Sequence, residues 1–89
     1  MSQPYLEVTY RHGRPLAAYL YLPRQAGDKS HHTVKSSPGL LIDFHKDGRP
    51  IGIEITDPTK ITLAALNRTL RELGVPAARK SDLLPLKAA

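Results

Sequence analysis

The 89-residue sequence contains no cysteine and no tryptophan, and Phe44 is its only phenylalanine. Without cysteine the chain cannot form a disulfide, a zinc–thiolate site or a thiol nucleophile, and for so small a chain this argues against an oxidising, secreted setting. No segment approaches the ~18 consecutive apolar residues that a membrane span requires. A strand-like pattern follows the first four residues directly, so we expect no signal peptide and a cytoplasmic protein without membrane contact.

Positive charge exceeds negative charge, with 13 lysines and arginines against 8 aspartates and glutamates, a formal net charge of +5. Such a balance permits binding to nucleic acid, for which Arg11, Arg14, Arg68 and Arg71 are the candidate residues. The cations are nevertheless scattered along the chain and form no run. A basic composition of this kind is also common in small domains that bind no nucleic acid.

Two segments near the N-terminus alternate apolar and polar residues, which is typical of half-buried strands. These segments are residues 5–10 and 16–22. If their apolar faces coincide, Val8 pairs with Ala18 and Tyr10 pairs with Leu16, which requires a three-residue loop over 12–14 with Gly13 in the left-handed region. Residues 23–30 are polar, contain proline and glycine, and predict an exposed loop.

A second hairpin is predicted by Asp47-Gly48 between the alternating segments 40–45 and 51–55. Either a two-residue turn or a four-residue loop pairs Ile42 with Ile53 and Phe44 with Ile51. A weaker strand over 31–36 and a turn over 37–39 precede this hairpin. The first half of the chain therefore predicts about five antiparallel strands.

The apolar period changes from 2 to 3.6 after residue 56, which predicts one helix over about 63–73. Thr62 is a suitable N-cap, and Gly74 followed by Pro76 ends the helix. Leucines 63, 66, 70 and 73 form one stripe, whereas Asn67, Arg68, Arg71 and Glu72 are expected to face water. The predicted fold is α+β, with one domain over 1–76, the helix on one sheet face, and a tail over 77–89 that either docks through Leu83, Leu84 and Leu86 or stays disordered.

The sheet face that turns away from the helix carries apolar and aromatic side chains where polar ones are usual. Ala17, Tyr19, Tyr21 and Leu41 are the residues predicted there, mixed with Glu7, Thr33, Asp43 and Glu54. Aromatic residues with a polar rim are typical of a protein interface. The same tyrosines are equally consistent with ordinary cross-strand packing.

Histidines and carboxylates raise a metal or acid–base hypothesis for Asp43, His45 and Glu54, which fall close together on the second hairpin. An open sheet face offers no burial to shift their pKa values, and no nucleophile lies nearby. His31 and His32 are adjacent and point to opposite faces of a strand, so they cannot bind one ion. We therefore expect solvated polar residues, no metal, no cofactor and no enzymatic activity.

The second hairpin also carries a family resemblance, in residues 37–44 followed by 47–55. This pattern resembles the small prokaryotic proteins of domain of unknown function 2283, which show a Pro-Gly-like turn, an apolar strand ending in Asp, an Asp-Gly turn and a Gly-Ile-Glu-Ile strand. The resemblance covers about residues 34–56. The acidic turn of the family is replaced here by residues 11–16, which contain two arginines, so no role of those acids carries over.

The resemblance implies a small sheet with a helix and no established activity, and some family members resemble antitoxin-like partners of small toxins. Together with the outer sheet face, this favours a non-enzymatic interaction module that self-associates or binds a small protein. The alternative hypothesis is a small basic protein associated with nucleic acid.

Overall fold

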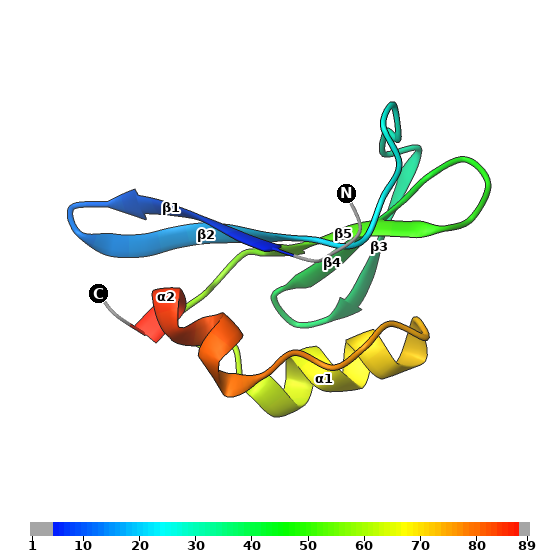
Figure 1. Cartoon of the computed structure of the whole chain (residues 1–89). Coiled ribbons are helices and arrows are strands. Elements are labelled where there is room, and N and C mark those ends of the chain that lie inside the picture. Colours follow the sequence, from blue (N-terminus) through cyan, green and yellow to red (C-terminus); the bar gives the residue numbers. More distant parts are fainter. Residues whose placement is uncertain (1–4, 88–89) are drawn as a thin grey trace.

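The computed structural model describes residues 5–87, which form one antiparallel sheet and a helical layer (Figure 1). The sheet contains β1 (Tyr5–Arg11), β2 (Arg14–Tyr21), β3 (His32–Ser37), β4 (Leu40–Phe44) and β5 (Pro50–Ile55). The helical layer contains α1 (Leu63–Glu72), a 3₁₀ turn η1 (Lys80–Leu83) and α2 (Leu84–Lys87). The strand order is β1-β2-β5-β4-β3, so β5 is central and the weak strand β3 lies at an edge. The predicted α+β class is confirmed.

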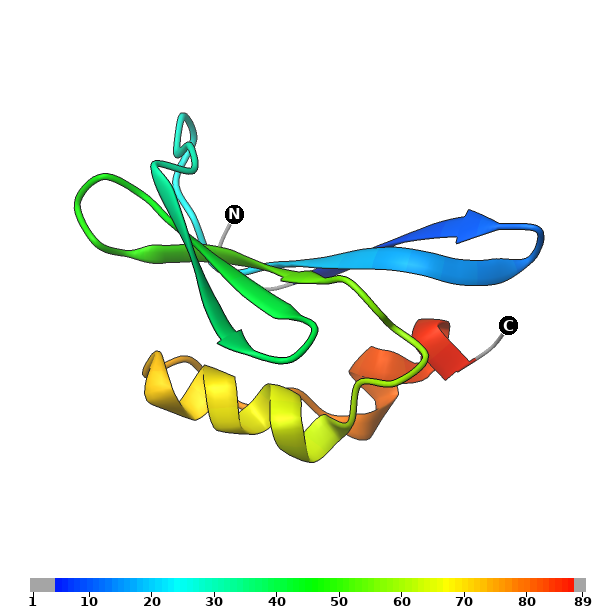
Figure 2. The same ribbon diagram turned by 180° about the vertical axis from the view of Figure 1, so that it is seen from behind.

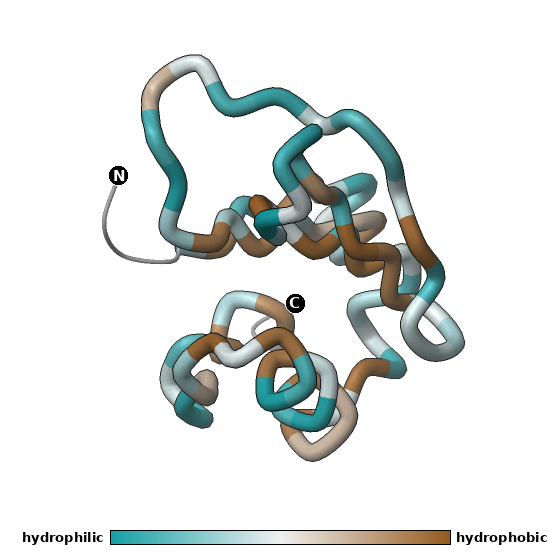
Figure 3. Tube along the Cα trace, turned by 90° about the vertical axis from the view of Figure 1, so that its right-hand side faces the viewer, coloured by the Kyte–Doolittle hydropathy of each residue, from teal (hydrophilic) through white to brown (hydrophobic). Residues whose placement is uncertain are grey.

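All helices lie on the same side of the sheet, as the two opposite views show (Figures 1 and 2). Seen at right angles to these views, the sheet and the helices form two layers, and the mostly hydrophilic loop after β2 stands on the far side of the sheet (Figure 3). The core between the layers includes Leu20, Ile42 and Ile53 from the strands and Leu66 and Leu70 from α1. Within residues 5–87, no layer covers the other sheet face.

The first hairpin keeps the predicted register at Val8–Ala18 but reaches it differently. Its turn consists of only two residues, His12 and Gly13, both with positive φ as in a type I′ turn. A β-bulge then follows, so that Tyr10 pairs with Pro15 and not with Leu16. The predicted three-residue loop and Tyr10–Leu16 pair are therefore wrong. Leu16 is the extra residue of the bulge and is 52% exposed.

The second hairpin also differs from the prediction in the pairing next to its turn. Ile42 pairs with Ile53 as expected, but Phe44 pairs with Pro50 because a bulge inserts Ile51. The amide of Gly48 donates to the carbonyl of His45, and Gly48 has a φ of +93°. This is a three-residue loop with a left-handed glycine, and the bulge restores the register that the apolar faces require.

Helix α1 begins and ends as the sequence indicates. The hydroxyl of Thr62 accepts a hydrogen bond from the amide of Ala65 at 3.1 Å. Gly74 has a φ of +70°, its amide donates to Arg71, and the amide of Val75 donates to Leu70. These two bonds are a Schellman motif, which satisfies carbonyls that the helix end leaves open.

The segment after α1 returns along the helix and packs against it. Asn67, predicted to face water, instead binds both backbone groups of Ala78, accepting from its amide at 2.7 Å and donating to its carbonyl at 3.1 Å. Leu83 and Leu86 are buried in the core, whereas Leu84 is 56% exposed. Among residues 5–87, no helix is long and apolar enough to cross a membrane.

Candidate interaction surface

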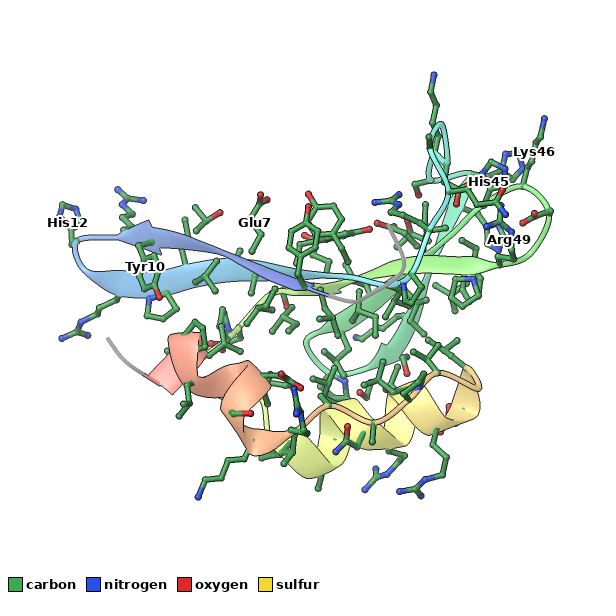
Figure 4. The ribbon with its side chains drawn as sticks, viewed as in Figure 1. Glu7, Tyr10, His12, His45, Lys46 and Arg49 are labelled. Carbon is green, nitrogen blue, oxygen red and sulfur yellow. The ribbon has the colours of Figure 1, made fainter. Side chains whose placement is uncertain are left out.

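The outer face of the sheet, opposite the helices, is defined by the strand register. Pairing places the following residues on the same face: Tyr5 with Tyr21, Glu7 with Tyr19, Tyr19 with Glu54, Leu41 with Glu54, and Thr33 with Asp43. Glu7 accordingly extends away from the helices, whereas Tyr10 lies on the helix side (Figure 4). Leu20 and Ile53 lie in the core, so the structure places Tyr19 and Tyr21 on the outer face.

Tyr19 lies across the central strand because Gly52 has no side chain there. A Cβ atom on Gly52 would overlap the hydroxyl and ring carbons of Tyr19. The open position lets the Tyr19 hydroxyl reach Asp43 on β4 and donate a hydrogen bond of 2.7 Å. Thr33 on β3 donates to the other oxygen of Asp43 at 2.6 Å. These bonds join β2, β4 and β3 across the outer face.

Burial and the neighbouring Asp43 carboxylate raise the pKa of Tyr19 well above its ordinary value. Both effects favour the neutral phenol, because the ionised form would lose hydration and stand beside a negative charge. The phenol therefore stays a hydrogen-bond donor at all ordinary pH values.

A second aromatic group continues the face toward β1. The rings of Tyr5 and Tyr21 stack with centroids 4.5 Å apart, and Tyr21 meets Tyr19 edge-on at 4.7 Å. The guanidinium of Arg24 lies 5.5 Å from the centroid of the Tyr21 ring, within cation–π range. Desolvation and the nearby Glu7 carboxylate raise the pKa of Tyr21. We name Tyr5, Tyr19 and Tyr21 the tyrosine cluster.

The centre of the outer face is occupied by Glu54, on the central strand β5. Its pairing partners are Tyr19 on one side and Leu41 on the other. The Glu54 side chain is exposed, and within residues 5–87 no hydrogen bond or ion pair reaches its carboxylate. Ala17 and Leu41, the other predicted interface residues, are partly exposed on the same face.

The four arginines of the nucleic-acid hypothesis are not gathered on one surface. Arg11 and Arg14 pair with each other at the tip of the β1–β2 hairpin. Arg68 and Arg71 lie on the exposed side of α1, in the other layer of the molecule (Figure 1). The structure thus holds two separate pairs of arginines.

The proposed group of Asp43, His45 and Glu54 does not converge. Asp43 is engaged by Tyr19 and Thr33, while the His45 ring nitrogen lies 3.1 Å from the carbonyl of Lys29 in the loop after β2. Over residues 5–87, no group of three or more histidine, aspartate or glutamate side chains is placed to hold a metal ion. His12 and His45 lie at opposite ends of the sheet (Figure 4).

Sequence reasoning missed an ion-pair network that fastens the loop over residues 23–30. Arg49 donates two hydrogen bonds to Asp28, at 3.0 and 2.9 Å, and a third to Asp47 at 2.7 Å. The bonds from Arg49, together with one from the amide of Gln25, lower the pKa of Asp28 to about 2. Because the partners are 21 residues apart, no local motif predicts the network. These contacts hold the loop in a folded position at one end of the outer face.

A mostly apolar cavity of about 410 Å³ lies on the other side of the sheet, between β1, β2, α1 and the segment after it. Leu6, Leu20 and Leu70 contribute to its walls, and Arg79 and Asp82 contribute polar groups. Arg79 and Asp82 already pair with each other at 3.6 Å. None of the residues predicted as site residues lines this cavity.

Residues 17–57 match the family model described as Protein of unknown function (DUF2283). This segment is a DUF2283 domain. The matched DUF2283 segment runs from within β2 to just past β5 and contains Tyr19, Asp43, Gly52 and Glu54. The resemblance inferred from the second hairpin is confirmed, and β1 and α1 lie outside the matched residues. No curated protein and no solved structure matches the sequence.

Proposed function

We propose that this DUF2283 protein is a non-enzymatic interaction module that binds a protein partner through the outer face of its sheet. The observation that carries the proposal is a sheet with all its described helices on one side and the tyrosine cluster on the other (Figures 1 and 2). Tyrosine is enriched at protein interfaces because its ring is large and rigid while its hydroxyl tolerates water.

Order within the tyrosine cluster supports the same proposal. Binding is weakened by the entropy of fixing flexible side chains, about 0.5–1.5 kcal/mol for each one immobilised. Here Tyr19 is already fixed by Asp43 and the space over Gly52, and Tyr21 is held between Tyr5 and Tyr19. A partner would therefore meet side chains that are positioned before it arrives.

A nucleic-acid partner on this face is opposed by charge. Glu7, Asp43 and Glu54 all belong to the outer face, where they would repel phosphate. The four arginines of the nucleic-acid hypothesis form two separate pairs, at the β1–β2 hairpin tip and on α1, and the Arg24 guanidinium lies over the Tyr21 ring. We therefore advance no second function.

The proposal is tested by native co-purification, with the full-length protein as bait at its natural abundance. The double variant Tyr19→Ala plus Tyr21→Ala is expected to stay folded, because both residues lie outside the core, but to lose a partner that the wild type retains in stoichiometric amount. Leu84→Ala is the control, since Leu84 is exposed in the helical layer. Retention of the partner by the double variant, or no partner on the wild type, would contradict the proposal.

A further inference from the structure

Carboxylates are grouped near the tyrosine cluster on the outer face. The chain carries a formal +5, yet the outer face holds three carboxylates, on Glu7, Asp43 and Glu54. The hydroxyls that bind Asp43 and Glu7 are neutral donors, so they orient these carboxylates without cancelling their charge. Lys35, on β3, pairs with Leu41 on β4, so it lies two strands away from Glu54, or about 10 Å.

Glu54 combines a central position with an unsatisfied charge. It stands on the middle strand between Tyr19 and Leu41, and its carboxylate has no side-chain or backbone partner in the described part of the chain. A carboxylate covered by a partner must be paired there, because burying an isolated charge is strongly unfavourable. Whatever covers this face therefore has to bring a cationic donor to Glu54.

The tyrosine cluster indicates which cation fits. Arg24 already stacks over the Tyr21 ring, so the face accommodates a guanidinium against a tyrosine within the protein itself. A guanidinium can stack on an aromatic ring and donate two parallel hydrogen bonds to a carboxylate, whereas an ammonium is a compact, strongly hydrated point charge. Glu54 beside Tyr19 presents both of these groups together.

Face-to-face pairing of two copies of this chain is disfavoured by the same charges. A two-fold symmetric contact places the same patch on both sides of the interface. Wherever Glu7, Asp43 and Glu54 approach the same carboxylates of the second copy, the like charges cost several kcal/mol, and Arg24 of each copy already lies over its own Tyr21 ring. The partner that complements this face is consequently a different protein.

We infer that the outer face binds an arginine-bearing segment of another protein, with one guanidinium paired to Glu54 beside Tyr19. This inference rests on the proposed function and names the chemistry of its partner. Glu54 would fix where the segment lies, and Ala17 and Leu41 would contact its apolar side chains.

A peptide probe tests the chemistry directly. The ¹⁵N-labelled full-length protein is titrated with ten-residue peptides of alternating valine and arginine, valine and lysine, or valine and glutamate, and amide resonances are followed by NMR. The arginine peptide is expected to shift Tyr19, Leu41 and Glu54, with weaker binding of the lysine peptide and none of the glutamate peptide. Glu54→Gln should weaken binding by about tenfold, the loss expected for a charge-assisted hydrogen bond.

Glu72→Gln is the matched control, because Glu72 is an exposed carboxylate on α1. Equal affinity for the wild type and Glu54→Gln, or shifts centred on other carboxylates, would overturn the inference. So would salt-sensitive self-association in sedimentation that Glu54→Gln abolishes, because the occupant would then be a second copy.

The co-purification distinguishes a failure of this inference from a failure of the proposed function. If Glu54→Arg keeps a partner that the double tyrosine variant loses, the surface is an interface but the arginine assignment is wrong. If the wild type keeps no partner, the proposed function itself fails. Loss of the partner from both variants, with Glu72→Gln unaffected, supports both.

Discussion

At the scale of single residues, Gly52 determines the shape of the outer face. Glycine is uncommon inside strands, and there it often marks a close approach of another group. The sequence predicts Tyr19 on the outer face, but the predicted pairs do not show that its ring crosses the central strand over Gly52. Side-chain rotamers decide that, and the position of Asp43 on the far side provides the hydrogen bond that holds it.

Gly52→Ala is expected to destabilise the fold by about 1–3 kcal/mol, the range for overpacking, because the new Cβ atom displaces the Tyr19 ring. Urea unfolding measures this change. In a Tyr19→Ala background the same substitution should have little effect, since the space above Gly52 is then open. An equal loss of stability in both backgrounds would show that the ring does not lie over this glycine.

Tyr19→Phe is expected to lower the free energy of unfolding by about 1 kcal/mol at neutral pH, through loss of the hydrogen bond to Asp43. Because the folded-state pKa of Tyr19 is raised above that of the unfolded chain, the advantage of the wild type is complete below pH 10. It decreases as pH rises above 10, where the unfolded chain releases this proton first.

Urea unfolding of both proteins between pH 8 and pH 11 measures this dependence, and Tyr5→Phe serves as the control. Absorbance titration of the wild type should also show that Tyr19 is the last of the four tyrosines to ionise. This last ionisation should be missing from Tyr19→Phe. A wild-type advantage that grows above pH 10 would contradict the assigned hydrogen bond.

At the scale of elements, alternation and helical periodicity specified which face each residue occupies, but not how the turns are built. Both hairpins were expected to have loops whose length alone aligns the apolar faces. Each instead uses a shorter or differently shaped turn and a β-bulge, at Leu16 and Ile51, that restores the same register. Burial of the apolar faces determines which residues pair in the strands, away from the turns. Several turn geometries are compatible with that pairing.

Helix α1 was predictable because its start and end are marked by local signals, Thr62 and Gly74. The role of Asn67 was not, because a polar residue on a helix predicts solvent unless the returning chain is known. The same limit applies to Asp28 and Arg49, whose contact depends on how two loops meet.

Asn67→Ala is expected to destabilise the protein by about 1–3 kcal/mol, because it removes two hydrogen bonds and leaves both backbone groups of Ala78 unpaired. Hydrogen exchange should become faster in residues 78–87 and stay unchanged in β4 and β5. Arg68→Ala is the control on the exposed side of the same helix. Unchanged exchange after residue 77 would mean that Asn67 does not hold the returning segment.

At the scale of the whole molecule, the two faces of the sheet differ in composition. One face supplies the core with leucine and isoleucine, and α1 with the following segment covers it. The other carries the tyrosine cluster and three carboxylates in a protein whose net charge is +5. The sequence shows the alternation that puts apolar core residues and outer-face residues on opposite sides of each strand. The orientation of Tyr19, Arg24 and Asp43 required the structure.

The most direct test of this account measures which face is open in solution. A neutral gadolinium chelate, added to the dilute protein, accelerates NMR relaxation of methyl groups that solvent can reach. The account predicts strong relaxation for Ala17 and Leu41 and protection for Leu20 and Ile53. Strong relaxation of Leu20 and Ile53, with Ala17 and Leu41 protected, would contradict it.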